Sequence, residues 1–210
     1  MEGAAGLTTH DRPSTGRSSR GRPPSTTHTE VARAALEMFA RDGFEQTTMD
    51  DIADALGVGR RTLFRYFPSK NDIVWGDFER VLDRLRTLLD ATPADVPIMR
   101  ALAEAIVESN RYQPNQLHEL RIRMTLITTV PALQAHSMLR YQAWRQVVAE
   151  FVAGRRGESP DDLVPQTIGY AMLGTSTAAF VHWVNNPDED LDANLAQAYG
   201  TLRASIALDQ

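Results

Sequence analysis

The sequence predicts an all-α protein with a small N-terminal domain and a larger C-terminal domain. Apolar residues recur at helical spacing along most of the 210 residues, and no long stretch shows the apolar–polar alternation of a β-strand. Proline and glycine fall between the periodic segments, where they end helices. Hydrophobic residues make up 42% and charged residues 23% of the chain, which is typical of globular proteins.

An arm of low apolar content precedes the first predicted helix. Residues 1–25 are rich in Gly, Ser, Thr, Arg and Pro, so we expect this arm to be disordered. It contains Arg20-Gly21-Arg22-Pro23, the core of the AT-hook, a segment that lies in narrow A·T-rich minor grooves. A solvated basic tail is the alternative interpretation. Both interpretations place Arg20 and Arg22 on DNA, and only the sequence preference differs.

The first predicted helix spans Thr27 to Asp42. Thr27 and Glu30 have the spacing of a capping box, and Gly43 provides a stop. We expect this helix to support the two helices that follow. Its apolar stripe consists of Val31, Ala35, Met38 and Phe39.

Two short helices joined by a tight turn follow. The first begins at Thr47 or Thr48 and ends at Gly57, where glycine adopts a left-handed conformation without steric cost. The second begins at Gly59 and ends before Pro68. Apolar residues of the two helices can pack together, which leaves the arginines of the second helix facing outward. This is the organisation of a helix-turn-helix, whose second helix enters the major groove of DNA.

Positive charge is concentrated around this motif, although the net charge of the chain is −5. Four basic residues and no acid lie between Asp54 and Asp72, whereas the chain from Asp90 onward has nine basic and fourteen acidic residues. Cationic charge at one end of an acidic chain is expected for a local DNA-binding surface.

The residues of this region also match a known pattern. Those that carry the match are Ala34-Ala35, Leu36, Phe39, Gly43-Phe44, Thr48, Ile52-Ala53, Gly57-Val58, Thr62-Leu63, Tyr66-Phe67 and Ser69-Lys70. With them the chain resembles the tetracycline-repressor (TetR) family from Thr29 to about Phe78. The runs 60–67, 68–71 and 75–78 are similar to the regulators found beside mycofactocin biosynthesis genes. The resemblance implies a TetR-like fold and a ligand-controlled transcriptional regulator.

The resemblance and the chemistry of DNA together predict the DNA contacts. Arginine can bridge O6 and N7 of guanine, so we expect Arg60 or Arg61 to read a base, with phosphate contacts as the alternative. The resemblance implies phosphate contacts for Thr48, Tyr66 and Lys70. The full predicted DNA-binding set is Arg20, Arg22, Thr48, Gly59, Arg60, Arg61, Thr62, Arg65, Tyr66 and Lys70.

The chain departs from the family pattern at two positions of the second helix. Gly59 stands where the family often has Ser or Thr, which weakens the helix cap only slightly. Phe64 stands where the family often has Tyr, so a hydroxyl for a phosphate hydrogen bond is missing. Arg65 is expected to compensate for it.

A long fourth helix is predicted from Lys70 to about Asp90, and the resemblance implies that it couples the two domains. A loop from Thr92 to Pro97 follows. Proline and glycine then divide the rest into five helices, at Ile98 to Tyr112, Gln116 to Thr129, Ala132 to Ala153, Asp161 to Val184 and Asp192 to Leu208. The predicted domains are a basic arm at 1–25, a helix-turn-helix domain at 26–72, and a ligand-binding and dimerisation domain at 73–210.

The last two predicted helices are expected to form a homodimer. Many small residues occur between Gly169 and Ala179, and small residues let another helix approach closely. The resemblance implies that these helices pair across a two-fold axis, so we place the dimer contact within residues 161–208. The same small residues would also make room for a helix of the same chain or for a pocket. A two-fold dimer predicts a palindromic operator with half-sites about 34–36 Å apart, or a multiple of this.

The resemblance further implies a small-molecule site in the C-terminal domain. The predicted ligand-binding residues are Arg121, Met124, Ile127, Tyr141, Trp144 and Met172, and Met138 and Phe180 extend this set. Each apolar member suits a plain core equally well. Arg121 and Arg123 flank the set and could bind a phosphate or carboxylate, although both also suit a solvated surface. An apolar chamber with cationic groups at its mouth would fit a fatty-acyl thioester.

Other classes of function find little support in the sequence. The chain has no cysteine, and its five histidines lack the spacing of metal ligands. It has no Gly-rich phosphate loop and no Gly-x-Ser-x-Gly motif, so we expect no enzyme activity, metal or cofactor. No apolar run suits a membrane span or a secretory signal, which favours a cytoplasmic protein. The predicted function is ligand-released repression, with a ligand-independent architectural protein or an activator as alternatives.

Overall fold

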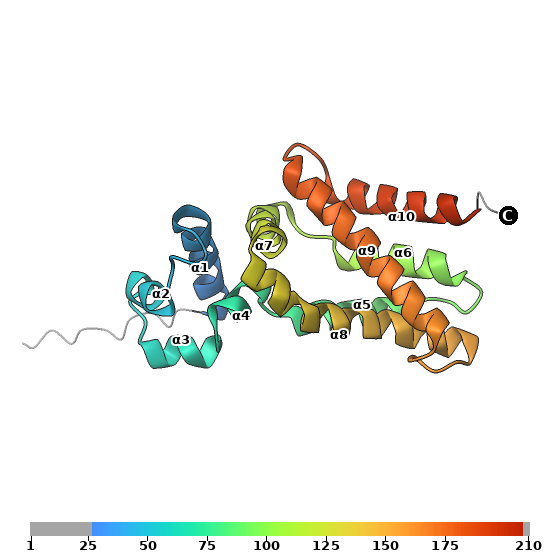
Figure 1. Cartoon of the computed structure of the whole chain (residues 1–210), viewed down its shortest axis with the longest axis horizontal. Coiled ribbons are helices and arrows are strands. Elements are labelled where there is room, and N and C mark those ends of the chain that lie inside the picture. Colours follow the sequence, from blue (N-terminus) through green and yellow to red (C-terminus); the bar gives the residue numbers. More distant parts are fainter. Residues whose placement is uncertain (1–26, 208–210) are drawn as a thin grey trace, which may run out of the picture.

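The computed structural model describes residues 27–207, which are helical apart from short connections (Figure 1). These residues contain no β-strand, which confirms the predicted all-α class. The predicted arm, with Arg20 and Arg22, lies outside the described residues. The helices are α1 (His28–Asp42), α2 (Met49–Leu56), α3 (Arg60–Tyr66), α4 (Lys70–Trp75), α5 (Phe78–Asp90), α6 (Ile98–Ser109), α7 (Leu117–Thr129), α8 (Pro131–Arg156), α9 (Leu163–Asn185) and α10 (Leu191–Ala207), with a 3₁₀ turn at Pro114–Gln116 before α7.

The helices gather into a small group and a larger one (Figure 1). In the small group α1 contacts α2 and α4, and α2 contacts α3. In the larger group α5 packs against α6 and α8, α8 against α9, and α9 against α10. Helix α7 lies between the groups, since it contacts α1 and α4 on one side and α8 and α9 on the other. The small group is therefore held to the body mainly through α7.

Local sequence signals begin and end the first helices as predicted. Thr27 Oγ1 accepts the N–H of Glu30 at 3.2 Å, and the Glu30 carboxylate accepts the N–H of Thr27 at 2.7 Å, which confirms the capping box. Thr48 and Asp51 form the same reciprocal pair at the start of α2, with distances of 3.1 and 2.9 Å. Gly57 ends α2 in the left-handed conformation, with φ +61°.

The predicted continuous helix from Lys70 to Asp90 is wrong, because the structure divides it at Gly76. Gly76 has φ +57° and ψ −145°, a conformation that residues with a side chain rarely adopt. Asp77 Oδ1 then accepts the N–H of Arg80 at 3.3 Å and caps the start of α5. Apolar spacing continues through both halves, so periodicity alone predicts one helix. The break places a hinge-like junction between the small group and the body.

The five helices predicted for the larger domain are all present, with ends that differ by three residues or fewer. Helix α8 begins at Pro131 itself, because the missing N–H of proline costs nothing in a first helical turn. Helices α9 and α10 are tied together by a short hydrogen bond between the Ser176 and Tyr199 hydroxyls. One buried cluster continues from α1 into α10, so packing alone does not mark a domain border. The division at residue 72 remains a prediction.

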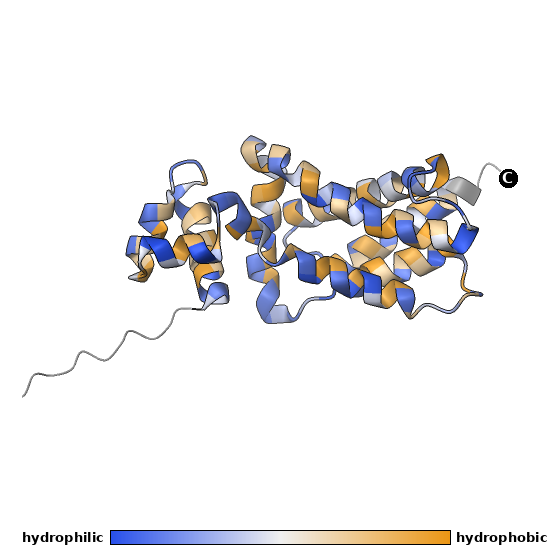
Figure 2. Ribbon diagram, turned by 90° about the horizontal axis from the view of Figure 1, so that it is seen from below, coloured by the Kyte–Doolittle hydropathy of each residue, from blue (hydrophilic) through white to orange (hydrophobic). Residues whose placement is uncertain are grey.

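Hydrophobic and hydrophilic residues alternate around the helices of both groups (Figure 2). In α5, for example, Phe78, Leu82, Leu85 and Leu89 are buried at spacings of three and four residues. Within the part of the chain that the structure describes, no helix combines the length and apolar character needed to cross a membrane.

Candidate DNA-recognition surface and ligand cavity

Helix α3 buries an apolar side and exposes a cationic one. Leu63 and Phe67, at and just after its end, are 0% and 2% exposed and lie in the core. Thr62 is half-buried. The exposed residues of the helix include the three predicted arginines, Arg60, Arg61 and Arg65. The outward orientation of these arginines, which the apolar spacing predicts, is thus present in the structure.

The two arginines predicted to read bases have different surroundings. Arg60 Nε pairs with Asp50 Oδ1 of α2 at 3.1 Å, and its guanidinium lies 5.5 Å from the ring centre of Phe64. Arg61 is exposed and makes no ion pair or hydrogen bond with any residue from 27 to 207. The Arg61 guanidinium is therefore free for a contact outside the chain, whereas Arg60 shares its charge with Asp50.

The predicted phosphate-contacting residues at the edges of α2 and α3 are arranged as follows. The Thr48 hydroxyl donates to Asp51 at 2.7 Å while it caps α2. Tyr66 is half-buried, and the Arg65 guanidinium lies 5.5 Å from its ring centre. Gly59 precedes α3 without a side-chain cap, as its missing side chain requires. Phosphate contacts by Thr48 and Tyr66 remain predictions.

Lys70 has an internal role in this structure. Its ammonium donates to the backbone carbonyls of Phe44 and Glu45 at 2.7 and 3.4 Å and lies 4.4 Å from the Phe44 ring centre. It also pairs with the Glu45 carboxylate at 3.7 Å. Lys70 thus ties the start of α4 to the segment between α1 and α2, and its predicted phosphate contact would compete with these bonds.

A cavity of about 120 Å³ lies where α4 and α5 meet the body. Burial raises the pKa of the Tyr112 and Tyr141 hydroxyls, so both side chains are neutral at physiological pH. The lining is mainly aromatic and aliphatic. It consists of Trp75, Phe78, Val81, Asn110, Tyr112, Leu120, Arg123, Met124, Ile127, Thr128, Tyr141, Trp144, Leu173, Ser176, Thr177 and Phe180.

The structure brings most of the predicted ligand-binding residues to this cavity. Those in its wall are Met124, Ile127, Tyr141, Trp144 and Phe180. Met172 is fully buried and lines a different groove, between α6 and α10. Met138 is 62% exposed on the outside of α8. Met172 and Met138 therefore do not line this cavity, and their contact with a ligand remains a prediction.

Arg121 does not line the cavity either, and its predicted ligand contact remains untested. Its guanidinium donates to the carbonyls of Trp183 and Pro187 and stacks 3.9 Å from the Trp183 ring centre, so it holds the end of α9. Arg123, two residues further on, lines the cavity instead. Residues two apart on a helix point in directions about 200° apart, so only one of this pair can face a given cavity.

Two lining residues, Trp75 and Phe78, were not predicted as ligand contacts. They stand on the two sides of Gly76, and their rings pack edge to face with centres 5.0 Å apart. Trp75 also packs edge to face on Tyr141 of α8, at 5.6 Å. The apolar spacing of this segment marks both residues as buried, but which cavity they line depends on the break at Gly76.

Charged contacts from α7 and α8 hold α4 to the body. Arg123 Nη1 donates to the carbonyl of Ile73 at 3.3 Å and to that of Val74. On the other side of α4, Arg140 of α8 pairs with Asp72 at 3.3 Å. His136 lies 3.8 Å from the same carboxylate. The position of α4 is thus set by polar contacts at both of its ends.

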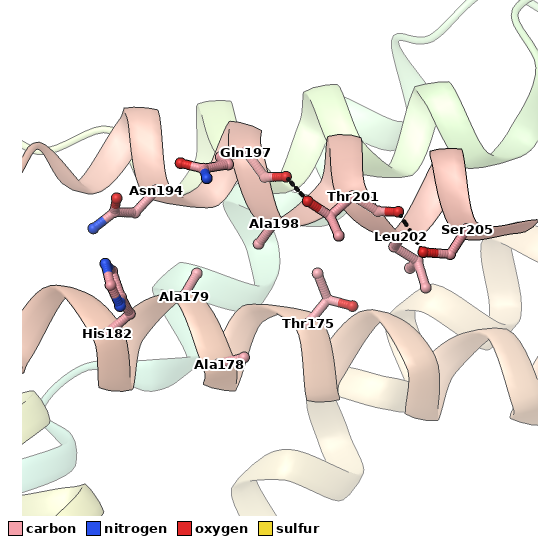
Figure 3. Close-up of a pocket in the computed structure, with 10 residues that line it drawn as sticks. All are labelled: Thr175, Ala178, Ala179, His182, Asn194, Gln197, Ala198, Thr201, Leu202 and Ser205. Atoms are coloured by element: carbon pink, nitrogen blue, oxygen red, sulfur yellow. Dashed lines mark hydrogen bonds between the residues drawn. The ribbon is translucent and has the colours of Figure 1, made fainter.

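Helices α9 and α10 form a groove of about 540 Å³ (Figure 3). Small side chains line much of it, namely Thr175, Ala178, Ala179, Ala198 and Thr201. His182 and Asn194 approach each other across its end (Figure 3). Asn194 Nδ2 is buried and has no hydrogen-bond partner among residues 27–207. These are the helices predicted to form the dimer.

Within residues 27–207, His, Asp and Glu side chains form no group of three or more that would suit a metal ion.

Comparison with known proteins places the chain among bacterial regulators. Residues 31–74 match the model of the bacterial regulatory proteins of the tetR family, and residues 96–207 match the MftR C-terminal domain. The chain is 40% identical over 186 residues to MftR of Mycobacterium tuberculosis, which is named for regulating mycofactocin biosynthesis; the match covers 89% of this chain and 94% of MftR. These relatives are transcriptional regulators and not enzymes.

Solved structures share the fold. The fatty acid degradation regulator FadR from Bacillus halodurans superposes with a TM-score of 0.62 at 20% identity, over 84% of this chain and 97% of that one. Thermus thermophilus FadR, a repressor solved in complex with lauroyl-CoA, superposes with a TM-score of 0.52 at 22% identity, over 82% of this chain and 91% of that one. With both family models and a relative of 40% identity, the chain belongs to the TetR family of transcriptional regulators.

Proposed function

We propose that the protein is a repressor that binds a palindromic operator as a homodimer and is released by a small apolar or amphipathic ligand. One observation carries this proposal. Trp75 and Phe78 line the cavity and stand on either side of Gly76, where α4 joins α5. A ligand in the cavity therefore touches the junction through which the DNA-binding helices are attached.

The DNA-binding part of the proposal rests on α3. Its buried side fixes the rotation of the helix, and its exposed side carries Arg60, Arg61 and Arg65. We propose Arg61 as the main base-reading residue, because Arg60 is engaged by Asp50. The exposed N-terminus of α2, capped by Thr48, would meet a phosphate.

The size of the cavity supports a mechanism of release. Its volume of about 120 Å³ is smaller than that of usual ligand pockets, which measure about 300–1,000 Å³. A ligand larger than a few waters must therefore push the walls apart, and two of the wall residues belong to the α4–α5 junction. Such a ligand binds better to a form with a displaced α4, and this difference in affinity is what shifts the population away from the DNA-binding form.

The lining favours the acyl chain of a fatty-acyl thioester as the ligand. Met124, Ile127, Tyr141 and Trp144 form an apolar surface that suits a hydrocarbon chain. Thermus thermophilus FadR, which has the same fold, was solved with lauroyl-CoA. The bulky coenzyme would remain outside, since the present cavity has no room for it.

We place the dimer contact on α9 and α10. Their groove is lined by small residues and contains the unpartnered Asn194 amide, which a second copy could satisfy. Leu163 and Tyr170 of α9 are 81% and 58% exposed in the single chain. A two-fold dimer would hold two α3 helices for two half-sites of one operator. We propose that this dimer acts in the cytoplasm, where DNA is accessible.

The test is a titration of the full-length protein against labelled DNA from upstream of its own gene, with excess nonspecific DNA, followed by acyl thioesters. Specific binding that one thioester abolishes, together with repression in a transcription assay, is the expected result. Specific binding that no ligand changes would support the architectural alternative. Ligand-dependent binding that stimulates transcription would show an activator and overturn the repressor proposal.

A further inference from the structure

Arg123 connects the cavity to α4. It lines the cavity, and its guanidinium also bonds to the last carbonyls of α4, those of Ile73 and Val74. Carbonyls at a helix C-terminus have no partner within the helix and favour a cation. Its side chain is only 16% exposed, so these bonds are sheltered from water. A change at the cavity can therefore reach α4 through a single side chain.

One residue of the cavity wall, Trp75, also carries an unpaired hydrogen-bond donor. Trp75 is 8% exposed, and its Nε1 is buried without a partner among the described residues. A buried donor without an acceptor costs about 1–3 kcal/mol, so such groups are rare unless a ligand or water completes them. The indole and Arg123 line the same cavity. Together they indicate that the ligand carries an oxygen acceptor.

The charge of the site indicates which acceptor fits. Glu119 already pairs with Arg123, at 2.8 Å, so the guanidinium is neutralised. A carboxylate entering the cavity would add an uncompensated negative charge in a largely apolar space, and this is costly. A neutral carbonyl oxygen accepts hydrogen bonds without adding charge. The site therefore selects an ester or thioester over a free acid.

We infer that Trp75 Nε1 and Arg123 bind the neutral carbonyl oxygen of an acyl ester or thioester, and that this bond draws Arg123 away from the carbonyls of Ile73 and Val74. The inference rests on the proposed function. It adds which side chains bind the polar group of the ligand and how this binding releases α4. Loss of the Arg123 bonds leaves the end of α4 unheld beside Gly76. In this mechanism Arg123 positions α4 in the ligand-free protein and releases it when ligand is bound.

Binding of the full-length protein to methyl octanoate and to octanoate tests the recognition step by calorimetry. We expect wild type to bind the ester more tightly than the acid. Trp75→Phe keeps an aromatic side chain but removes the N–H donor together with the five-membered part of the indole, and loss of the hydrogen bond should weaken ester binding by roughly 3- to 10-fold. Trp183→Phe is the matched control: it makes the same change at a tryptophan outside the cavity, whose N–H already donates to the Glu189 carbonyl at 3.1 Å, and it should leave ester binding unchanged. A preference for the acid, or equal effects of both variants, would overturn the inference.

The trigger is tested by the ratio of operator dissociation constants with and without saturating ester. Arg123→Gln should lower operator affinity without ligand and bring this ratio close to one. Arg140→Gln removes another contact between α4 and the body but does not line the cavity. It should lower operator affinity and leave the ratio unchanged. A ratio in Arg123→Gln equal to that of wild type would overturn the trigger, whereas failure of wild type to respond to any ester or thioester would instead refute the proposed function.

Discussion

Arg60 of the recognition helix is paired with Asp50 of the preceding helix, with 3.1 Å between Nε and Oδ1. Both side chains are more than half exposed, so the pair contributes little to stability, about 0–1 kcal/mol. We expect the pair to act on DNA recognition instead. An acid beside Arg60 lowers the local positive potential and orients the guanidinium, whereas the adjacent Arg61 has no such constraint.

The pair predicts unequal effects of the two arginines on DNA binding. Arg61→Ala should weaken binding to the operator by about 1–3 kcal/mol and relax the base preference at one position of each half-site, as expected for loss of a bidentate base contact. Arg60→Ala should weaken binding less, because part of its charge is already neutralised. Fluorescence anisotropy with wild-type and single-base variant operators measures both effects.

Arg86 provides the control for this comparison. It is an exposed arginine of α5, paired with Asp83 and remote from α3 in the sequence. Arg86→Ala should leave operator affinity and base preference unchanged. Equal losses for Arg60→Ala and Arg61→Ala, with base preference intact in both, would show that α3 contacts only phosphates.

Substitution of Gly76 should destabilise the protein. Ala at φ +57° costs about 1–3 kcal/mol, and its Cβ would lie 2.9 Å from Arg123 Nη1. Gly154→Ala, inside α8 with no atom within 4 Å of the new Cβ, should instead stabilise by about 0.4–1 kcal/mol. Chemical denaturation gives both values. A Gly76→Ala protein with unchanged stability would mean that α4 and α5 can join without the break.

The Asp51 cap should make the helix-turn-helix sensitive to acid. Hydrogen bonds from the Thr48 hydroxyl and N–H lower the pKa of the Asp51 carboxyl below its ordinary value. A depressed pKa means that the cap stabilises fully above the unfolded-state pKa, about 3.9, and that this contribution is lost as pH falls through the lower folded-state pKa. Stability measured from pH 7 to pH 3 should therefore fall less steeply in Asp51→Asn than in wild type. Parallel curves of stability against pH for the two proteins would show that Asp51 does not contribute to the acid response.

A charge placed in the α9–α10 groove should separate the dimer. Ala178 lines this groove and is exposed in the single chain, so Ala178→Glu would put a buried, unpaired charge into the proposed contact. Analytical ultracentrifugation should show monomers, and operator affinity should fall with them. The matched control is Ala135→Glu on the exposed side of α8, which should remain dimeric. A dimeric Ala178→Glu protein would place the contact on another face.

Much of the fold is readable from local signals, as three positions show. Thr27 and Glu30 predict the start of α1, and Gly57 predicts the end of α2, because capping depends on residues a few positions apart. The Gly76 break is missed for a physical reason. The apolar face continues from Ile73 to Leu89, so periodicity does not register a change of direction. The available signal is local: a glycine directly followed by an Asp that can cap the next helix.

The candidate sites are predictable to different degrees. The arginines of α3 follow from helical spacing, since their opposite side must be buried. Arg121 and Arg123 cannot be assigned by composition, because both are arginines on one helix and only tertiary packing decides which of them reaches the cavity. The unpaired Trp75 donor is invisible in the sequence, since it depends on the absence of an acceptor contributed by distant helices.

In the proposed mechanism a ligand changes the spacing of the two recognition helices, and the absence of cysteine allows a direct measurement of this spacing. A single Ala55→Cys substitution on the exposed side of α2 accepts one spin label per protomer, and pulsed electron paramagnetic resonance gives the distance between the two labels. We predict a narrow distance distribution in the operator complex and a clear displacement of its mean when the acyl ester or thioester releases the DNA. An unchanged distribution at a ligand concentration that releases the operator would show that release does not depend on the spacing of the two helices.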